Sequence, residues 1–305
     1  MNRRDFVKTA GAGCLAASLA RGGKNRNLQV GHTGITWVSF GPGGGKNPGA
    51  DPSTIERTFQ ALGGLRFYGL ELFSWQIAGM EQNGGLARYI EKYNLPLISA
   101  YGGPSLLDAS KRRENIADCL TWARLLKKYN GRVVTIGPNG VPRASYHFQE
   151  HKAEIIATLN EFGKALGDIG LTGCLHQHTG TCIESREETY AVMEAVDTRY
   201  VKFGPDIGQL QKGGSDPVQV VKDFLPIINH MHVKDYSGGA EWVGYCPLGQ
   251  GKVDIPTILD MMDGRKLAGM LMVELDSSPR MPMPPEKSAA IAKAYLEQQR
   301  VVFPS

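Results

Sequence analysis

The feature that most constrains the fold of this chain is the alternation of eight short apolar runs with longer amphipathic segments. The apolar runs cover residues 28–34, 68–73, 95–101, 132–137, 172–176, 201–205, 227–233 and 269–275. Short buried strands that alternate with helices form a parallel sheet whose faces are covered by the helical crossovers. Eight such units predict an α/β protein, a single-domain (β/α)8 TIM barrel, with a doubly wound open sheet as the runner-up.

The helical segments carry start and stop signals. The first is expected to begin at Asp51-Pro52-Ser53, where Asp51 is a candidate N-cap and Pro52 the first helical residue, and to stop at Gly63-Gly64. Later helices are expected near residues 85–93, 111–129, 146–166, 186–196, 217–224, 255–262 and 285–300. The barrel domain therefore spans residues 28–303, which is enough for the roughly 250 residues that such a barrel needs.

Composition and charge narrow the class of protein. Of the 305 residues, 42% are hydrophobic and 21% charged, which is typical of a globular chain with a sizeable core. The net charge of +4 comes from 34 basic and 30 acidic residues spread along the chain, so it does not indicate a nucleic-acid partner. The cysteines after residue 20 lack CxxC spacing, and we interpret them as mostly buried thiols.

The first twenty residues differ from the rest of the chain. Arg3-Arg4 precede a Gly/Ala-rich apolar stretch that ends at Ala17-Ser18-Leu19-Ala20. This resembles a twin-arginine signal peptide, and the apolar run is too short to span a bilayer. Residues 1–20 therefore predict export to the periplasm or beyond by the twin-arginine translocation machinery, with cleavage after Ala20. Lipidation at Cys14 is the alternative, although no Leu stands three residues before it.

Metal-capable side chains follow several of the predicted strands. They are Glu71 after the second strand, His176 and His178 after the fifth, Asp206 after the sixth, His230, His232 and Lys234 on or after the seventh, and Glu274 with Asp276 after the eighth. The active site of a TIM barrel is assembled where strands end, so these side chains are expected to meet. A lone histidine at a strand end is more often structural, but their joint occurrence on neighbouring strands predicts a metal site.

The ordered motifs resemble the xylose-isomerase-like sugar phosphate isomerases and epimerases, and within them the inosose dehydratase branch. The motifs are His176-Gln177-His178-Thr179-Gly180-Thr181, Asp206-Ile207-Gly208, His230-Met231-His232-Val233-Lys234-Asp235, Pro247-Leu248-Gly249-Gln250-Gly251 and Val273-Glu274-Leu275-Asp276. In the epimerase relatives, a Glu, an Asp, a His and a Glu from strands five to eight hold one divalent metal, and two carboxylates move the substrate proton.

The resemblance implies a ligand set of His176, Asp206, His232 and Glu274. His176 stands where the epimerase relatives carry Glu, so either His176 or His178 could be the first ligand. Imidazole and carboxylate ligands without thiolate suit Mn²⁺, Mg²⁺, Co²⁺, Fe²⁺ or Zn²⁺, with Mn²⁺ the first choice. Gln209 occupies the position of a substrate-binding His in the family motif.

The chemistry that the resemblance implies is proton abstraction beside a carbonyl group. Loss of the first Glu favours elimination over epimerisation, with His178 or His176 taking the proton and Glu274 as a further catalytic group. Lys234 would protonate or polarise the leaving oxygen, unless it faces the surface and pairs with Asp235. Glu71 would bind sugar hydroxyls or act as an acid or base, unless it forms a structural salt bridge.

The predicted partner is a small carbohydrate. Trp37 and Trp75 follow the first two strands and are candidates for substrate contacts together with Gln209 and His230, although both tryptophans could equally pack in the core. Export favours an unphosphorylated keto-sugar, keto-glycoside or keto-cyclitol, and an oligomer is left open. The alternatives are a catalytically silent periplasmic sugar-binding barrel and, less favoured, an endonuclease IV-like metal hydrolase.

Overall fold

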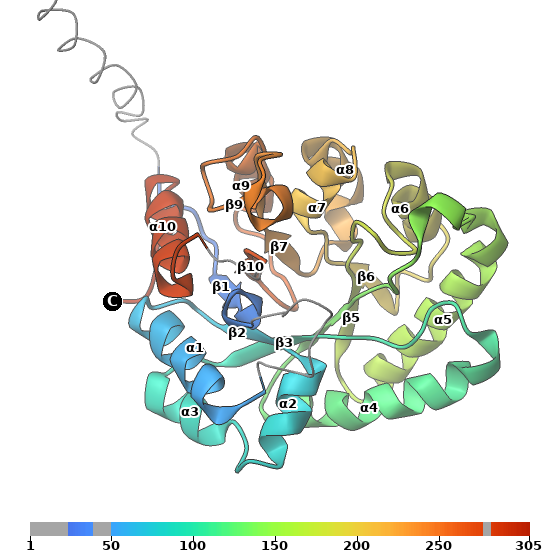
Figure 1. Ribbon diagram of the computed structural model, residues 1–305, viewed down its shortest axis with the longest axis horizontal. Coiled ribbons are helices and arrows are strands. Elements are labelled where there is room, and N and C mark those ends of the chain that lie inside the picture. The colour runs from blue at the N-terminus through green and yellow to red at the C-terminus, as the bar shows by residue number, and fades with distance from the viewer. Residues whose placement is uncertain (1–23, 39–49, 277–281) are drawn as a thin grey trace, which may run out of the picture.

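Eight parallel strands form the centre of the computed structural model, which describes residues 24–38, 50–276 and 282–305 (Figure 1). The strands are β1 (Val30–Thr33), β2 (Leu70–Phe73), β3 (Leu97–Tyr101), β4 (Val133–Ile136), β5 (Thr172–Leu175), β6 (Val201–Phe203), β7 (Met231–Val233) and β10 (Leu271–Val273). Each lies within one of the eight predicted apolar runs. The predicted signal peptide, residues 1–20, and Cys14 lie outside the described residues.

The strands follow one another around the sheet in the order β6-β5-β4-β3-β2-β1-β10-β7. All seven ladders are parallel. The seam between β6 and β7 is bridged by the parallel pairs Phe203–Ile228 and Asp206–His232. Backbone bonds cross the same seam, since His232 N donates to Pro205 O at 2.9 Å. The sheet is therefore a nearly closed barrel, which confirms the predicted single-domain (β/α)8 fold.

Helices surround the barrel on its outside (Figure 1). They are α1 (Pro52–Gly64), α2 (Ser74–Glu81), α3 (Ala87–Tyr93), α4 (Arg112–Lys128), α5 (Phe148–Asp168), α6 (Arg186–Met193), α7 (Ile207–Lys212), α8 (Pro217–Phe224), α9 (Ile255–Met262) and α10 (Pro285–Gln298). The predicted start of α1 is confirmed, because Asp51 accepts a hydrogen bond from Thr54 N at 2.9 Å and Pro52 is the first helical residue.

Three features, two helices and one strand pair, were not expected from the sequence. Helix α2 begins directly after β2, and Gln76 Oε1 accepts the Phe73 N–H at 2.9 Å to start it. Helix α7 follows β6 after three residues and is capped by Asp206. A small antiparallel pair, β8 (Asp235–Tyr236) and β9 (Tyr245–Cys246), extends the loop after β7. All three lie near the carboxyl ends of their barrel strands, where the candidate site is built.

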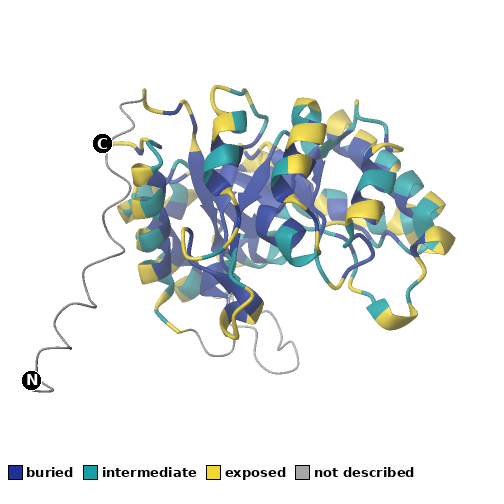
Figure 2. Ribbon diagram, turned by 90° about the horizontal axis from the view of Figure 1, so that it is seen from above, coloured by how far each residue is buried: buried dark blue, intermediate teal, exposed yellow. Residues whose placement is uncertain are grey.

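The core is continuous from the barrel strands to the inner faces of the helices. The strands are buried and the helices carry their exposed residues on the outward side (Figure 2). The cysteines at 119, 174, 182 and 246 are buried, as predicted, and none of these four forms a disulfide. In the part of the chain that the structure describes, no helix combines the length and apolar character needed to cross a membrane.

Candidate active site

A cavity of about 130 Å³ opens at the carboxyl ends of the barrel strands. Its lining residues are Thr33, Gly34, Ile35, Glu71, Leu72, Phe73, Tyr101, His176, His178, Glu274 and Asp276. Strands β1 to β3 supply the apolar and aromatic side of this cavity, whereas β5 and β10 supply imidazoles and carboxylates. A pocket with one apolar wall and a few convergent polar groups is typical of small-molecule sites.

His176, Asp206 and His232 form a group in which candidate ligand atoms lie within 4.8 Å of one another. Asp206 and His232 are brought together by the seam pairing of β6 with β7, and His176 follows β5 with its backbone N–H bonded to Ile136 O. Asp206 Oδ1 caps α7 by accepting from Gly208 N and Gln209 N. The other oxygen, Oδ2, and both His176 nitrogens are buried and have no hydrogen-bond partner.

This donor set fits a divalent ion. Buried polar atoms are normally paired, so the unpartnered nitrogens of His176 beside Asp206 and His232 indicate a ligand there, while Asp206 Oδ2 faces the Lys234 ammonium at 3.0 Å. Burial and the neighbouring charge of His232 hold the pKa of His176 well below its usual value, so the His176 imidazole is neutral and keeps a free electron pair. Two imidazoles and a carboxylate suit the transition metals and zinc.

The imidazole of His232 lies between two carboxylates. Its Nε2 is 2.8 Å from Glu71 Oε1 and its Nδ1 is 2.9 Å from Glu274 Oε2. Both contacts have ion-pair distances but lie outside hydrogen-bond geometry. Burial favours the neutral ring, yet Glu274 and Glu71 outweigh it and raise the pKa of His232 well above its ordinary value.

Lys234 is fully buried beside the same carboxylates. Its ammonium nitrogen is 2.6 Å from Glu274 Oε1, 3.0 Å from Asp206 Oδ2 and 3.1 Å from Asp276 Oδ1. Gly208 makes room for the lysine stem, because a Cβ there would come within 2.9 Å of Lys234 Cβ. Burial opposes the charge, but the three carboxylates outweigh it and raise the Lys234 pKa. Lys234 therefore does not face the surface, and Asp235 instead accepts from backbone N–H groups.

His178 lines the cavity with both ring nitrogens paired. Thr179 N can only donate, and it donates to Gln209 Oε1 at 3.2 Å, so the Gln209 amide nitrogen must face His178 Nε2 at 2.8 Å. Nε2 therefore accepts, and Nδ1 carries the proton that it shares with Thr179 O at 2.7 Å. This network assigns one neutral tautomer to His178 and explains why Gln209 stands beside it.

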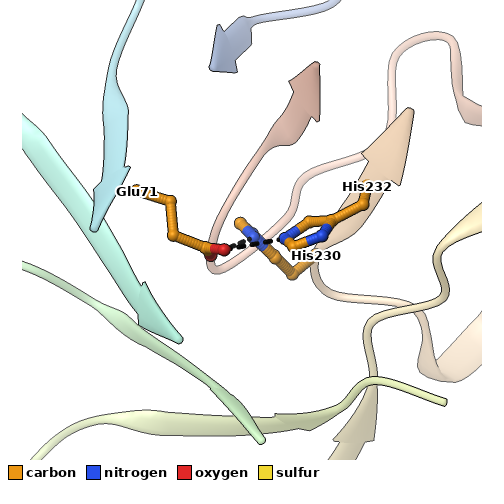
Figure 3. A group of neighbouring side chains, drawn as sticks. All are labelled: Glu71, His230 and His232. Carbon is orange, nitrogen blue, oxygen red and sulfur yellow. Dashed lines mark hydrogen bonds and ion pairs between the residues drawn. The ribbon is translucent and has the colours of Figure 1, made fainter. Parts of the chain in front are cut away.

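Glu71 and His230 lie deeper in the barrel (Figure 3). Glu71 Oε2 accepts from Thr135 Oγ1 at 2.6 Å and contacts His230 Nε2 at 3.1 Å. Met270 N donates to His230 Nδ1 at 3.3 Å. Burial is the largest influence on the His230 pKa and lowers it, which keeps the ring neutral. His230 is not among the residues that line the cavity, so its predicted substrate contact remains a prediction.

The two tryptophans predicted to contact substrate lie beside the cavity rather than in its lining. Trp37 is buried and its Nε1 donates to Glu286 at 3.3 Å. Trp75 stacks on Phe73 with ring centroids 5.4 Å apart. Phe73 and Tyr101 form the aromatic wall instead. Sequence reasoning missed Tyr101, although it ends the third apolar run and so stands at a position where a barrel site is built.

Comparison with known proteins agrees with this geometry. Residues 64–299 match the family model described as xylose isomerase-like TIM barrel. The inosose dehydratase of Clostridium botulinum (strain Alaska E43 / Type E3) is 24% identical over 240 residues, which cover 70% of this chain and 80% of that protein.

Two solved structures show the same fold. One, described as IOLI protein with a binding zinc atom, has a TM-score of 0.70 and 14% identity, and the match covers 90% of this chain and 98% of that one. The other, a 3-keto-D-glucoside 4-epimerase from E. coli, has a TM-score of 0.63 and 15% identity, with 90% and 99% covered. The similarities support an enzyme of the sugar isomerase/epimerase-like or inosose dehydratase-like kind. Because the family model matches well over half of its length, the chain belongs to the xylose isomerase-like TIM barrel family.

Proposed function

We propose that this protein removes a proton from the carbon beside a carbonyl group of a keto-sugar, keto-glycoside or keto-cyclitol. Elimination of water or an alcohol would follow, as the inosose dehydratase relative suggests by name. The observation that carries the proposal is the convergence of His176, Asp206 and His232, with both His176 nitrogens buried and unpartnered, at the open end of the barrel. Isomerisation or epimerisation is the second outcome of the same proton abstraction, and the 3-keto-D-glucoside 4-epimerase shares the fold.

The divalent ion would be held by His176, Asp206 and His232, with Glu274 as the fourth ligand. A zinc atom in the IOLI structure supports this type of cofactor, and Mn²⁺ remains our first choice for this chain. When bound, the ion supplies Lewis acidity at the carbonyl and neighbouring hydroxyl oxygens, which stabilises negative charge that develops on proton removal.

His178 is the proton acceptor that the cavity favours. The Nδ1–H bond to Thr179 O leaves the basic electron pair on Nε2, which the Gln209 amide occupies before substrate arrives. Gln209 can turn its amide to a sugar hydroxyl and release Nε2 for the proton. Lys234 is not itself a lining residue, but its ammonium lies 3.1 Å from Asp276, which lines the cavity, and we propose that it polarises or protonates a leaving oxygen there.

The proposal is tested with purified protein, elemental analysis and a panel of inososes, 3-keto-glucosides and ketohexoses followed in D₂O by NMR. We expect one equivalent of divalent metal and deuterium at the carbon beside the carbonyl, with loss of water or aglycone if elimination follows. Absence of both metal and exchange would support a silent sugar-binding barrel. Metal-dependent cleavage of DNA with no sugar exchange would support the endonuclease IV-like alternative.

Two histidines of the same motif provide a matched pair of variants. His176→Asn should lose metal and activity together, because it removes a ligand. His178→Asn should keep the metal and lose about 10²- to 10⁴-fold in exchange rate, because it removes only the proton acceptor. Loss of metal from His178→Asn but not from His176→Asn would make His178 the ligand and His176 the proton acceptor.

We also propose that the protein is exported by the twin-arginine route. The proposal rests on Arg3-Arg4 and the short apolar stretch that follows them. Replacement of both arginines by lysine should leave the protein in the cytoplasm, as measured by cell fractionation. Unchanged export of that variant would contradict this route.

A further inference from the structure

The Glu71 carboxylate contacts side chains from β4 and from the β7 region, neither of which neighbours its own strand β2 in the sheet. It lies on β2, whereas Thr135 lies on β4, His232 on β7 and His230 just before β7. Thr135, Glu71, His230 and His232 are each at most 2% exposed. In Figure 3 the Glu71 carboxylate points across the barrel toward both imidazoles. The contacts cross the barrel interior, and His232 belongs both to them and to the metal-capable group of His176, Asp206 and His232.

The side chains that contact the Glu71 carboxylate all present N–H or O–H groups to it. Met270 N–H occupies His230 Nδ1, so His230 must carry its proton on Nε2, which faces Glu71. The Thr135 hydroxyl donates to the same oxygen, and His232 Nε2 faces the other oxygen. Glu71 is therefore a carboxylate whose two oxygens are both engaged.

From this accounting we infer that Glu71 is a positioning residue for His232 and neither an acid, a base nor a substrate ligand. Its Oε1 lies 2.8 Å from Nε2 of His232, so Nδ1, which lies 2.9 Å from Glu274 Oε2, is the ring nitrogen left for an ion that displaces this contact. The inference rests on the proposed metal-dependent function. Metal-ligating histidines commonly donate their second N–H to a carboxylate, which fixes the ring and makes it a better ligand.

Thr135 and His230 have a supporting role in the same arrangement. Both bind Oε2 of Glu71, so that Oε1 is left for His232. Burying a carboxylate without hydrogen-bond donors costs folding free energy, so without Thr135 and His230 the Glu71 carboxylate would rotate toward other donors. His230 is in turn oriented by the Met270 backbone. The two histidines of the motif thus have different roles. His232 would face the ion, and His230 binds the Glu71 carboxylate that orients His232.

The test compares three substitutions at buried positions: Glu71→Gln, Thr135→Val and, as a control, Thr58→Val. Thr58 is buried on α1 and its hydroxyl bonds only to Thr54 O, so its loss should not reach the barrel interior. The readouts are Co²⁺ and Zn²⁺ affinity by chelator competition, the visible spectrum of the Co²⁺ protein, and the unfolding midpoint of the chelated protein.

Glu71→Gln should weaken metal binding by about 10- to 100-fold and change the Co²⁺ spectrum, because the ring of His232 is no longer held. Thr135→Val should shift both readouts in the same direction by less, and Thr58→Val should shift neither. Wild-type metal affinity and spectrum in a folded Glu71→Gln protein that has lost proton exchange would overturn the inference and make Glu71 an acid or base. Failure of the wild-type protein itself to bind metal would instead contradict the proposed function.

Discussion

The two halves of the barrel contribute different things to the cavity. Strands β1 to β4 and their loops supply the wall of Ile35, Leu72, Phe73 and Tyr101, and their one carboxylate there, Glu71, is held by hydrogen bonds and ion pairs. Strands β5, β6, β7 and β10 supply the groups with free electron pairs or charge. They are His176, His178, Asp206, His232, Lys234, Glu274 and Asp276. The second half therefore supplies the candidate reactive groups. The first half supplies the apolar wall of the cavity and, through Glu71, contacts that position His232.

Removing a ligand from the reactive half should have the largest effect. Asp206→Asn keeps the cap of α7, since Asn is a good N-cap, but replaces the oxygen that would face the proposed ion. If that ion supplies several kcal/mol of transition-state stabilisation, as we propose, kcat/KM should fall by on the order of a thousandfold together with metal content.

Asp216 provides the control for this change. It caps α8 with the same pattern, accepting from Val218 N and Gln219 N, but lies at the surface. Asp216→Asn should leave both metal content and kcat/KM within about twofold, because an exposed cap keeps its function with Asn. Retention of full metal by Asp206→Asn would remove Asp206 from the ligand set.

The buried ammonium of Lys234 should contribute the next largest effect. Lys234→Met leaves Asp206, Glu274 and Asp276 without their shared cation, and breaking a buried ion pair typically costs about 3–5 kcal/mol. Denaturant unfolding of the chelated protein measures this loss. Lys164→Met removes an exposed pair with Asp168 and should cost at most about 1 kcal/mol. Equal losses in the two variants would show that the buried cluster is not held by Lys234.

Much of the reactive half was visible in the sequence because barrel geometry converts strand ends into neighbours. Once eight strands are recognised, His176, Asp206 and His232 must converge. The same reasoning could not separate His176 from His178. Their difference depends on the Gln209 amide and the Thr179 backbone, which belong to another loop and to the local turn.

The supporting half was harder to predict. Nothing near Glu71 in the sequence shows that Thr135 and His230 bind it, since they lie 64 and 159 residues away. Helix α2 carries a mixed sequence, Ser74-Trp75-Gln76-Ile77, without the apolar stripe that marks a surface helix, and it starts directly at the end of β2. Trp75 was therefore expected to follow a strand toward substrate, whereas it sits in the first turn of a helix.

His32, the histidine on strand β1 of the first half, should affect stability rather than catalysis. It is buried on β1 between Trp37 and Phe67, and burial lowers its pKa to about 4 despite the Thr33 carbonyl and Glu274. The unfolded chain titrates near 6.5 and so binds more protons than the folded chain below that pH. Stability is therefore full above about pH 6.5 and falls as the pH drops toward 4, by about 3 kcal/mol.

His32→Phe isolates this contribution. The variant should lose about 3 kcal/mol less than the wild type between pH 7 and pH 4 in denaturant unfolding, because carboxylates and other histidines titrate in both proteins. Identical pH dependence would mean that His32 is protonated without cost in the folded protein, in conflict with its apolar surroundings.

Substitutions in the aromatic wall should have the smallest effect on activity. They also distinguish the roles of two neighbouring rings, Phe73 and Trp75. Phe73 lines the cavity, whereas Trp75 stacks behind it. Phe73→Ala should raise KM about tenfold with little change in kcat, because it removes apolar contact made equally in the ground and transition states. Trp75→Ala should change KM by less, since it acts only through Phe73. A larger effect on KM from Trp75→Ala would support the sequence prediction that Trp75 contacts substrate. In that case the loop after β2 must change position on binding, and the first half would not be the fixed wall that its packing indicates.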